Sequence, residues 1–399
     1  MSNKVRIAIA GCGGISYAHL NGYRALLENG IDAFQITAAC DVEKNRAERL
    51  ADAVQKFQDG SKPTVYTDFE HLIHDKAIDA VDICSSVSSH HTLALAALEN
   101  GIHATIEKPF AVTVKAGLKM VQTAEKMNKV IAISENARFA QGVRMSRWAL
   151  DQDYIGDQQM MVFGSTGAQV WYPDKIVAGT PWRHDKMIAG AGAVLDLGSH
   201  SFDVIRYLCG EVDEVYGVTK VLLPFRVNRN ETGDIIQKVP SNVDDVAFAI
   251  LKFKNGAIGM FGTGWGGHGE ATGFQDGFTI QGSKGSLKDA SGNPKIALDD
   301  GTKIDIQRQF NESIGIEIKE RLFTRGITDT FALELFEFIN AILTGEKPDN
   351  HGWHGLQDII ISYAITESSW FNCPVKIEDI ISGKFEGYQK EINEKYGLD

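Results

Sequence analysis

The segment 194–203 contains three ionisable side chains at four- and three-residue steps, Asp196, His200 and Asp203. If the chain is helical from about Val194, this spacing places all three on one face. An imidazole with an ordinary pKa of about 6.5 can take a proton from an alcohol and return it, and a carboxylate can orient the ring. The segment therefore predicts a catalytic pair, Asp196 and His200. The alternative is a buried structural histidine beside a surface aspartate.

Lys108 is the next candidate, in the triplet Glu107-Lys108-Pro109 directly after the predicted strand Ile102–Ile106. A residue before proline adopts an extended backbone, and the carboxyl ends of parallel strands face the ligand in a doubly wound sheet. The ammonium of Lys108 can then bind a substrate hydroxyl and stabilise an alkoxide as hydride leaves. The alternative is a solvated lysine at a strand end.

A glycine-rich turn follows the predicted strand Val5–Ala10 and opens the helical stretch Tyr17–Asn29. Gly11 can take the backbone angles of the turn, and Gly13 leaves room for a pyrophosphate beside the helix N-terminus. Ser16 replaces the usual third Gly or Ala but is small enough for close packing. The cofactor-binding residues predicted here are Gly11, Gly13, Gly14, Ile15 and Ser16.

Asp41 follows the second predicted strand, Phe34–Cys40. A carboxylate at this place accepts hydrogen bonds from the hydroxyls of an adenosine ribose and repels a 2′-phosphate. No arginine follows it directly, although Lys44 and Arg46 lie close in the sequence. We therefore expect NAD rather than NADP as the cofactor.

Metal binding is not predicted, because the nearest additional ligands, His90 and His91, have no metal-ligand spacing. The cysteines lie far apart and form neither a zinc pattern nor a disulfide framework, so buried reduced thiols are expected. The cysteines are Cys12, Cys40, Cys84, Cys209 and Cys373.

The size and charge of the chain limit its organisation and partners. A chain of 399 residues is too long for one ordinary core, so two domains are expected. The formal charge of −12 disfavours nucleic acid and anionic membranes as partners. No apolar run reaches membrane length, so we expect a cytoplasmic protein.

Strand and helix patterns alternate through residues 1–136, which predicts an α/β Rossmann domain with a doubly wound parallel sheet. Residues 137–399 predict an α+β domain, since strand-like segments separated by turns fill 212–306. The clearest hairpin is 246–261, around Asn255-Gly256. The second domain should therefore contain a largely antiparallel open sheet.

Together these motifs resemble the family of glucose–fructose oxidoreductase, inositol dehydrogenase and rhizopine catabolism proteins. The resemblance rests on Gly11-x-Gly13, Asp41, Ser85–His90, Glu107-Lys108-Pro109 and Asp196-x-x-x-His200. It implies a Rossmann domain, then a substrate-binding domain whose open sheet forms subunit contacts. It also implies NAD or NADP as cofactor, a secondary alcohol of a sugar or cyclitol as substrate, and a homodimer or homotetramer.

The resemblance also implies roles for single residues. Lys108 matches the family's substrate-contacting lysine, Asp196 its carboxylate and His200 its proton-transfer histidine. His90 matches a histidine near the nicotinamide that ends a threonine–proline–asparagine–x–x–histidine run, although Ser86 and Val87 stand where that run has Pro and Asn. The cofactor-binding residues implied in this way are Ser85, His90, Glu107 and Lys108.

The segment 180–185 is similar to substrate-side loops of sugar and inositol members of the family. Trp182 can offer a flat face to a sugar ring, or else pack in the core, and Arg183 can bind hydroxyls or an acidic group. The substrate-binding residues expected are Lys108, Trp182, Arg183, Asp196 and His200. Further candidates for the same wall are Trp171, Tyr172, Trp265 and His268.

The sequence thus predicts an NAD(H)-dependent dehydrogenase acting on a sugar, glycoside or cyclitol. Two alternatives belong to other classes. One is a glycosidase that oxidises its sugar transiently and regenerates NAD, and the other is a non-catalytic sensor that binds dinucleotide.

Overall fold

The computed structural model describes residues 4–166, 180–265, 277–289 and 292–398. The chain forms two compact units. The first comprises Met1–Phe139 and Lys319–Leu356, and the second comprises Ala140–Ile318 and Gln357–Asp399. Residues 319–356 therefore lie in the first unit, although the sequence analysis grouped them with the second domain.

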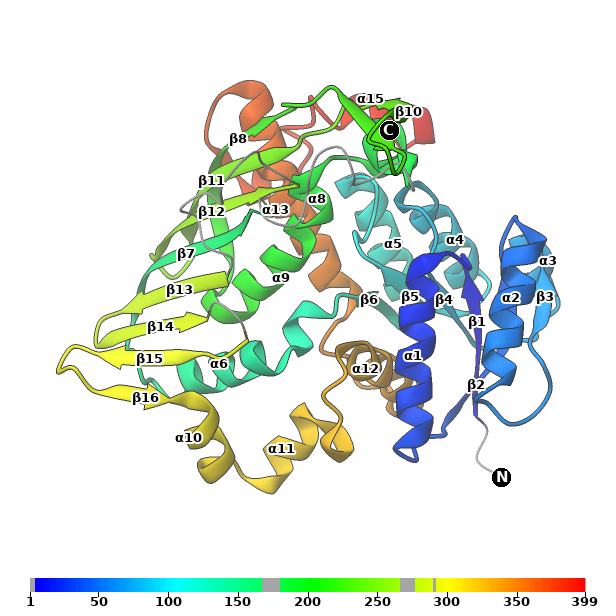
Figure 1. Ribbon diagram of the computed structural model, residues 1–399, viewed down its shortest axis with the longest axis horizontal. Coiled ribbons are helices and arrows are strands. Elements are labelled where there is room, and N and C mark those ends of the chain that lie inside the picture. The colour runs from blue at the N-terminus through cyan, green and yellow to red at the C-terminus, as the bar shows by residue number, and fades with distance from the viewer. Residues whose placement is uncertain (1–3, 167–179, 266–276, 290–291, 399) are drawn as a thin grey trace. The chain divides into compact units, whose positions relative to one another are not determined.

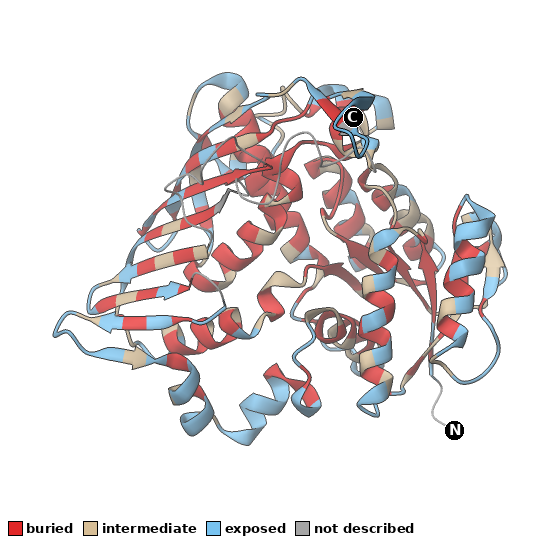
Figure 2. Cartoon of the chain, in the orientation of Figure 1, coloured by how far each residue is buried: buried red, intermediate tan, exposed pale blue. Residues whose placement is uncertain are grey.

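The first unit contains a six-stranded parallel sheet in the order β3-β2-β1-β4-β5-β6. The strand order reverses beside β1, so the carboxyl ends of β1 and β4 form the switch point where such sheets bind ligands. Figure 2 shows the central strands buried. The predicted doubly wound sheet is confirmed. Its strands are β1 (Val5–Ala10), β2 (Phe34–Cys40), β3 (Thr64–Tyr66), β4 (Ala80–Ile83), β5 (His103–Glu107) and β6 (Ile131–Ser134).

Helix α12 (Thr330–Thr344) packs beside α1 (Gly14–Glu28) in the first unit (Figure 1). Gly22 makes this approach possible, because a Cβ there would lie 2.9 Å from the carbonyl carbon of Phe331. This packing explains why a late segment of the chain joins the first unit. The other helices of this unit are α2 (Lys44–Gln55), α3 (Phe69–His74), α4 (Val87–Glu99), α5 (Val114–Lys126), η1 (Ala137–Phe139) and η3 (Thr324–Gly326).

Helix α4 begins at Val87, inside the run Ser85–His90. The Ser89 hydroxyl donates to the carbonyl oxygen of Ser86 at 2.7 Å and lies 2.8 Å from the hydroxyl of Ser85. Serine is neutral to unfavourable inside helices because its hydroxyl bonds to nearby backbone groups, as Ser89 does here, and Ser86 at the start of α4 caps no amide. The serine-rich run therefore belongs to the first turn of the helix rather than to a preceding loop.

The second unit contains a nine-stranded sheet in the order β16-β15-β14-β13-β7-β12-β11-β8-β17, and a separate ribbon of β9 and β10. Only β7 and β12 pair in parallel among the described neighbours of this sheet, so the prediction of a largely antiparallel sheet is confirmed. The predicted hairpin is β11–β12, with Gly256 at φ 90°. The strands are β7 (Gln158–Thr166), β8 (Val212–Lys220), β9 (Phe225–Arg229), β10 (Ile235–Pro240), β11 (Val246–Phe253), β12 (Ile258–Gly264), β13 (Gly277–Gly282), β14 (Gly285–Asp289), β15 (Lys295–Leu298), β16 (Lys303–Asp305) and β17 (Val375–Lys376).

Helices cover one face of this sheet, where the rings of Phe202 and Phe261 lie 4.6 Å apart. The opposite face exposes apolar side chains from four adjacent central strands. They are Met160, Tyr216, Val218, Phe248, Ile250, Ile258 and Met260. The remaining helices are α6 (Gln141–Asp151), η2 (Pro181–His184), α7 (Lys186–Ala189), α8 (Ala193–Asp196), α9 (Gly198–Cys209), α10 (Ile306–Ser313), α11 (Ile316–Leu322), α13 (Gly352–Phe371), α14 (Ile377–Ile381) and α15 (Lys390–Tyr396).

In the described parts of the chain, no helix combines the length and the hydropathy that a membrane span requires.

Candidate active site

The turn after β1 needs glycine at position 11 for two reasons. Gly11 has φ +92°, a conformation that other residues rarely adopt. A Cβ at this position would also lie 2.7 Å from the carbonyl group of Cys84 and from the amide nitrogen of Ser85. The turn is therefore pressed against the loop after β4, at the switch point of the sheet.

The next two glycines lie beside open space. No described atom comes within 4 Å of a Cβ built on Gly13 or Gly14. Helix α1 starts at Gly14 without a side-chain cap, and the Ser16 hydroxyl donates to the carbonyl oxygen of Gly13 at 2.7 Å. A helix of this length has a partial positive charge at its first turn. The turn and helix therefore fit the pyrophosphate of a dinucleotide.

The carboxylate of Asp41 is fixed beside this turn by two backbone amides. Oδ2 accepts from the Cys12 amide at 2.7 Å, and Oδ1 accepts from the Glu43 amide at 2.8 Å. Each carboxylate oxygen can accept more than one hydrogen bond, so Asp41 can also receive the hydroxyls of a ribose. The geometry matches the predicted contact with the adenosine end of NAD.

His90 lies on α4 and is fully buried between two backbone carbonyl groups. Its Nδ1 is 3.0 Å from the carbonyl oxygen of Pro109, and its Nε2 is 3.1 Å from that of Ser85. Burial lowers the pKa of His90 to about 4, so the ring is neutral near pH 7 and donates one hydrogen bond only. His90 thus lies between the loop after β4 and the loop after β5 and donates a hydrogen bond to one of the two carbonyl groups. Its predicted contact with the cofactor stays a prediction.

Lys108 follows β5 and is half-buried, in a cis Lys108–Pro109 peptide. The carboxylate of Glu107, which is mostly buried, accepts the backbone amide of Lys108. Strand β5 adjoins β4, so Lys108 and Ser85 extend from neighbouring strand ends. The first unit thereby brings Gly11, Gly13, Asp41, Ser85 and Lys108 to one edge of its sheet.

A buried polar network below this edge was not predicted from the sequence. His19 Nδ1 lies 2.9 Å from Asp82 Oδ2, and the Tyr23 hydroxyl donates to the same oxygen at 3.1 Å. Burial disfavours a charged His19, but the adjacent Asp82 outweighs it and raises the pKa of His19. The sulfur of Cys84 is 3.5 Å from His19 Nδ1, so His19, Asp82 and Cys84 form a cluster of side chains of the kinds that bind metal ions. Because Asp82 already pairs with Nδ1, we interpret them as an ion-pair network that fixes α1 to β4.

In the second unit, the predicted continuous helix through Asp196 and Asp203 is wrong. The segment forms α8 (Ala193–Asp196) and α9 (Gly198–Cys209), separated at Leu197. The Ser199 hydroxyl donates to the carbonyl oxygen of Leu195 at 2.6 Å, and this type of bond bends helices. Of the three polar residues, Asp203 is fully buried, Asp196 is mostly buried and His200 is partly exposed.

Asp244 fixes the start of α8. Its two carboxylate oxygens accept the amides of Gly192 at 2.7 Å and Val194 at 2.8 Å, and its carbonyl oxygen accepts that of Ala193 at 3.0 Å. Burial raises the pKa of Asp244 to about 6, although both amides favour the charged form. The segment that contains Asp196 is thus attached to the strand region before β11.

Two side chains contact the carboxylate of Asp196. Arg183 Nη1 lies 3.4 Å from Oδ2, and the indole Nε1 of Trp265 donates to the same oxygen at 3.2 Å. The Arg183 guanidinium also lies 5.0 Å from the centre of the half-exposed Trp182 ring. The structure therefore brings together Trp182, Arg183 and Asp196, as the sequence analysis expected.

Trp265 has a different place from the one predicted. It was a candidate for the substrate wall, but it is only 3% exposed and donates to Asp196. No local signal could have shown this contact, because the two residues are 69 positions apart. The other wall candidates, Trp171, Tyr172 and His268, lie outside the described residues.

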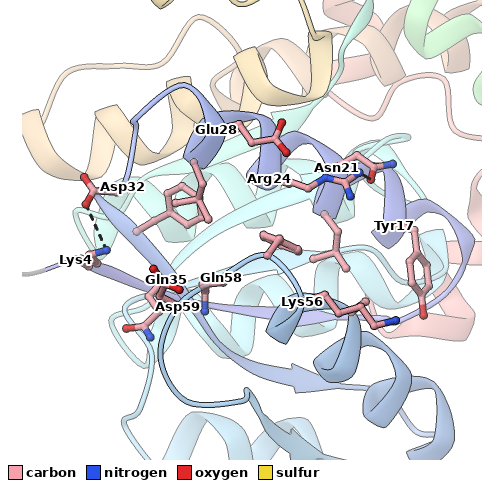
Figure 3. A pocket seen from close by; sticks show the side chains of 15 residues that line it. Lys4, Tyr17, Asn21, Arg24, Glu28, Asp32, Gln35, Lys56, Gln58 and Asp59 are labelled. Atoms are coloured by element: carbon pink, nitrogen blue, oxygen red, sulfur yellow. Dashed lines mark hydrogen bonds and ion pairs between the residues drawn. The ribbon is translucent and has the colours of Figure 1, made fainter.

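A groove in the first unit lies away from the predicted cofactor edge (Figure 3). It runs along α1 and the amino-terminal part of β2, and Lys4 and Asp32 form an ion pair at its rim. Leu20 and Phe34 contribute apolar surface. None of the predicted cofactor-binding residues lines this groove, so it is separate from the predicted dinucleotide site.

The parallel sheet and its glycine turn define the first unit as a Rossmann-type dinucleotide-binding unit. Comparison with known families agrees. Residues 5–135 match the oxidoreductase family with an NAD-binding Rossmann fold, and residues 143–288 match the GFO/IDH/MocA C-terminal domain. The chain belongs to this family of oxidoreductases, which confirms the resemblance predicted from its motifs.

Two relatives resemble most of the chain, and a third resembles a shorter part of it. Levoglucosan dehydrogenase of Pseudarthrobacter phenanthrenivorans is 28% identical over 291 residues, which cover 71% of this chain and 73% of the relative. Myo-inositol 2-dehydrogenase of Thermotoga maritima is 25% identical over 379 residues, covering 94% of this chain and 100% of the relative. Glycosyl hydrolase family 109 protein 1 of Akkermansia muciniphila is 30% identical over 159 residues, covering 39% of this chain and 32% of the relative.

A solved structure has the same fold. A levoglucosan dehydrogenase in complex with NADH superimposes with a TM-score of 0.78 at 24% identity. The match covers 94% of this chain and 99% of that chain.

Proposed function

We propose that this protein is an NAD(H)-dependent dehydrogenase of a secondary alcohol on a sugar, glycoside or cyclitol. The observation that supports it most directly is the open first turn of α1 beside a fixed Asp41 carboxylate. When NAD is bound with its pyrophosphate at this turn, its nicotinamide would supply the hydride acceptor.

In this proposal the chain's own residues bind and deprotonate the alcohol. Lys108 donates a hydrogen bond to the substrate hydroxyl, His200 accepts its proton, and Asp196 orients the imidazole.

The substrate class is proposed from the relatives and from two side chains. Levoglucosan and myo-inositol, named in two relatives, are cyclic polyols with secondary hydroxyl groups. Trp182 presents a half-exposed ring that can pack on the C–H face of such a substrate. Arg183, beside it, can bind hydroxyl groups. We propose NAD over NADP because Asp41 lies where a 2′-phosphate would be repelled.

The oligomeric state and location are also proposals. The exposed apolar face of the nine-stranded sheet, which includes Phe248 and Ile250, supports a homodimer or homotetramer formed through this sheet. A cytoplasmic location fits the absence of a membrane-spanning helix in the described residues.

A substrate panel tests the proposed function. Monosaccharides, glycosides and inositols would be incubated with NAD and with NADP, and the absorbance of the reduced cofactor would be followed. We expect reduction of NAD with at least one cyclic polyol and a lower kcat/KM with NADP. Tight NAD binding without turnover across the panel would instead support the dinucleotide sensor.

The glycosidase is a second candidate because part of the chain resembles a glycosyl hydrolase family 109 protein. Nitrophenyl glycosides in the same panel distinguish it from a dehydrogenase. Release of nitrophenol that requires NAD but accumulates no NADH would support the glycosidase.

A further inference from the structure

Trp265 connects two parts of the second unit. It directly follows β12, and its backbone amide donates to the carbonyl oxygen of Asp245 at 2.9 Å. Its ring packs with Ala193, at the start of α8, and with Val243. The indole is therefore held both by the sheet and by the short helix that ends at Asp196.

The indole is also restrained at its edge and its face. The His184 ring contacts Trp265 edge-on, with centres 5.7 Å apart and an interplanar angle of 82°. The guanidinium of Arg226 lies 6.0 Å from the centre of the Trp265 ring. Aromatic and cation–π contacts of this kind depend on ring orientation. The direction of the indole N–H is consequently set by its surroundings.

This N–H points at the carboxylate oxygen that Arg183 also contacts. Trp265 Nε1 donates to Asp196 Oδ2 at 3.2 Å, and Arg183 Nη1 lies 3.4 Å from the same atom. Rotation of the carboxylate would therefore lose both contacts. Hydrogen bonds to charged groups are stronger than those between neutral groups, and a mostly buried carboxylate depends on them.

We infer that Trp265 is a positioning residue that fixes the Asp196 carboxylate through its indole N–H and thereby supports proton transfer at His200. This inference rests on the proposed function, because it assigns Asp196 the role of orienting His200. Trp265 itself contacts neither substrate nor cofactor in this assignment.

Trp265→Phe tests the inference because it keeps an aromatic ring and removes the indole N–H donor together with part of the ring volume. We expect kcat to fall about 10- to 100-fold, as for the loss of one hydrogen bond to a charged group. The KM for NAD should stay within about 2-fold, since the cofactor edge belongs to the first unit. The acid limb of the pH profile should move to higher pH, because a carboxylate that loses a donor carries more negative charge towards His200 and favours the protonated imidazole.

Trp148→Phe is the matched control. Trp148 is also buried in the second unit, where its ring contacts Phe310 edge-on at 5.3 Å. This variant should keep the wild-type pH profile. A Trp265→Phe protein with the kcat and pH profile of the wild type would overturn the inference.

A double-mutant cycle distinguishes positioning from a general loss of structure. If Trp265 acts through Asp196, adding Trp265→Phe to Asp196→Asn should change kcat less than 2-fold further. An effect as large as in the wild-type background would contradict the inference.

An NMR measurement separates this inference from the proposed function. In ¹⁵N-tryptophan-labelled protein, the indole signal that disappears in Trp265→Phe should shift in Asp196→Asn, while that of Trp148 should not. A wild-type protein without turnover on any polyol would reject the proposed function, yet the indole shift would still be observed. An unchanged Trp265 signal would reject the contact itself.

Discussion

The cofactor edge of the first unit and the Asp196 region of the second unit are built in different ways. Backbone groups form most of the cofactor edge. The amides of Cys12 and Glu43 bind the Asp41 carboxylate, and Gly11 packs against the backbone of Cys84. Side chains form most of the Asp196 region, where Trp265 and Arg183 both contact the Asp196 carboxylate.

This difference predicts how each region responds to substitution. A backbone-built site tolerates changes of side chain unless they add bulk or alter φ, so its sensitive positions are glycines. A site built from side chains loses function through single donors and acceptors, even where the backbone is unchanged.

The largest expected effect separates catalysis from cofactor binding. His200→Ala should lower kcat by about 10³-fold or more, because general base catalysis is lost. The Kd for NAD should change less than about 2-fold, since the proposed cofactor contacts lie in the first unit. Stopped-flow turnover measures kcat, and isothermal titration calorimetry with NAD measures the Kd. Turnover like that of the wild type would reject the role of His200.

Two glycine substitutions at the cofactor edge should have separable effects. Gly13→Ala adds a Cβ in open space at φ −81°, so folding should be unaffected. The Kd for NAD should rise about 10- to 100-fold, because the added Cβ keeps the charged pyrophosphate away from the backbone amides that donate hydrogen bonds to it.

Gly11→Ala provides the contrast, since its Cβ would contact the Cys84 backbone at 2.7 Å and the residue has φ +92°. The free energy of unfolding should fall by about 2 kcal/mol or more. Urea denaturation of both variants checks the pair. Equal stabilities would contradict the close approach of Gly11 to the strand end.

Asp41→Asn should change cofactor preference by a smaller factor. The amide accepts fewer hydrogen bonds from ribose hydroxyls and no longer repels a 2′-phosphate. We expect the ratio of kcat/KM for NAD to that for NADP to fall about 10-fold. Glu43→Gln, at the adjacent exposed position, is the control. A ratio that stays constant in Asp41→Asn would remove Asp41 from the cofactor site.

The smallest effect concerns pH and involves both units. Burial lowers the pKa of His90 in the first unit and of His184 in the second, each to about 4. Between about pH 4 and about pH 6.5 the unfolded chain, whose histidines have pKa values near 6.5, binds more protons than the folded chain. The contribution of His90 and His184 to the free energy of unfolding is therefore complete above about pH 6.5 and is lost as the pH falls towards 4.

At pH 5.5 the loss from His90 should be about 1 kcal/mol relative to pH 7.5. Urea denaturation at both pH values would measure it in the wild type, in His90→Asn and in His74→Asn, an exposed control. The pH dependence should weaken only in His90→Asn. The same dependence in all three proteins would show that His90 is not the group responsible.

Much of the first unit could be predicted because its signals are local. The strand Val5–Ala10, the glycine turn and α1 are consecutive in the chain, and Asp41 and Lys108 each follow a strand directly. Apolar periodicity and turn chemistry determine such neighbours without distant contacts. The start of α4 within the serine-rich run 85–89 was not predicted, because serines have no strong helical pattern.

The sequence by itself therefore determined the order of strands and helices, the family and the residue types of the proposed site. Tertiary structure alone decided that α12 joins the first unit, that the helix around Asp196 divides at Leu197, and that Trp265 donates to Asp196. The place of α12 and the Trp265–Asp196 contact depend on packing between segments far apart in the chain, and the division at Leu197 combines the local Ser199–Leu195 bond with the distant Asp244 that fixes α8. Local preferences are too weak to specify which distant surfaces will meet, because that choice is made by the burial and hydrogen bonding of the whole unit.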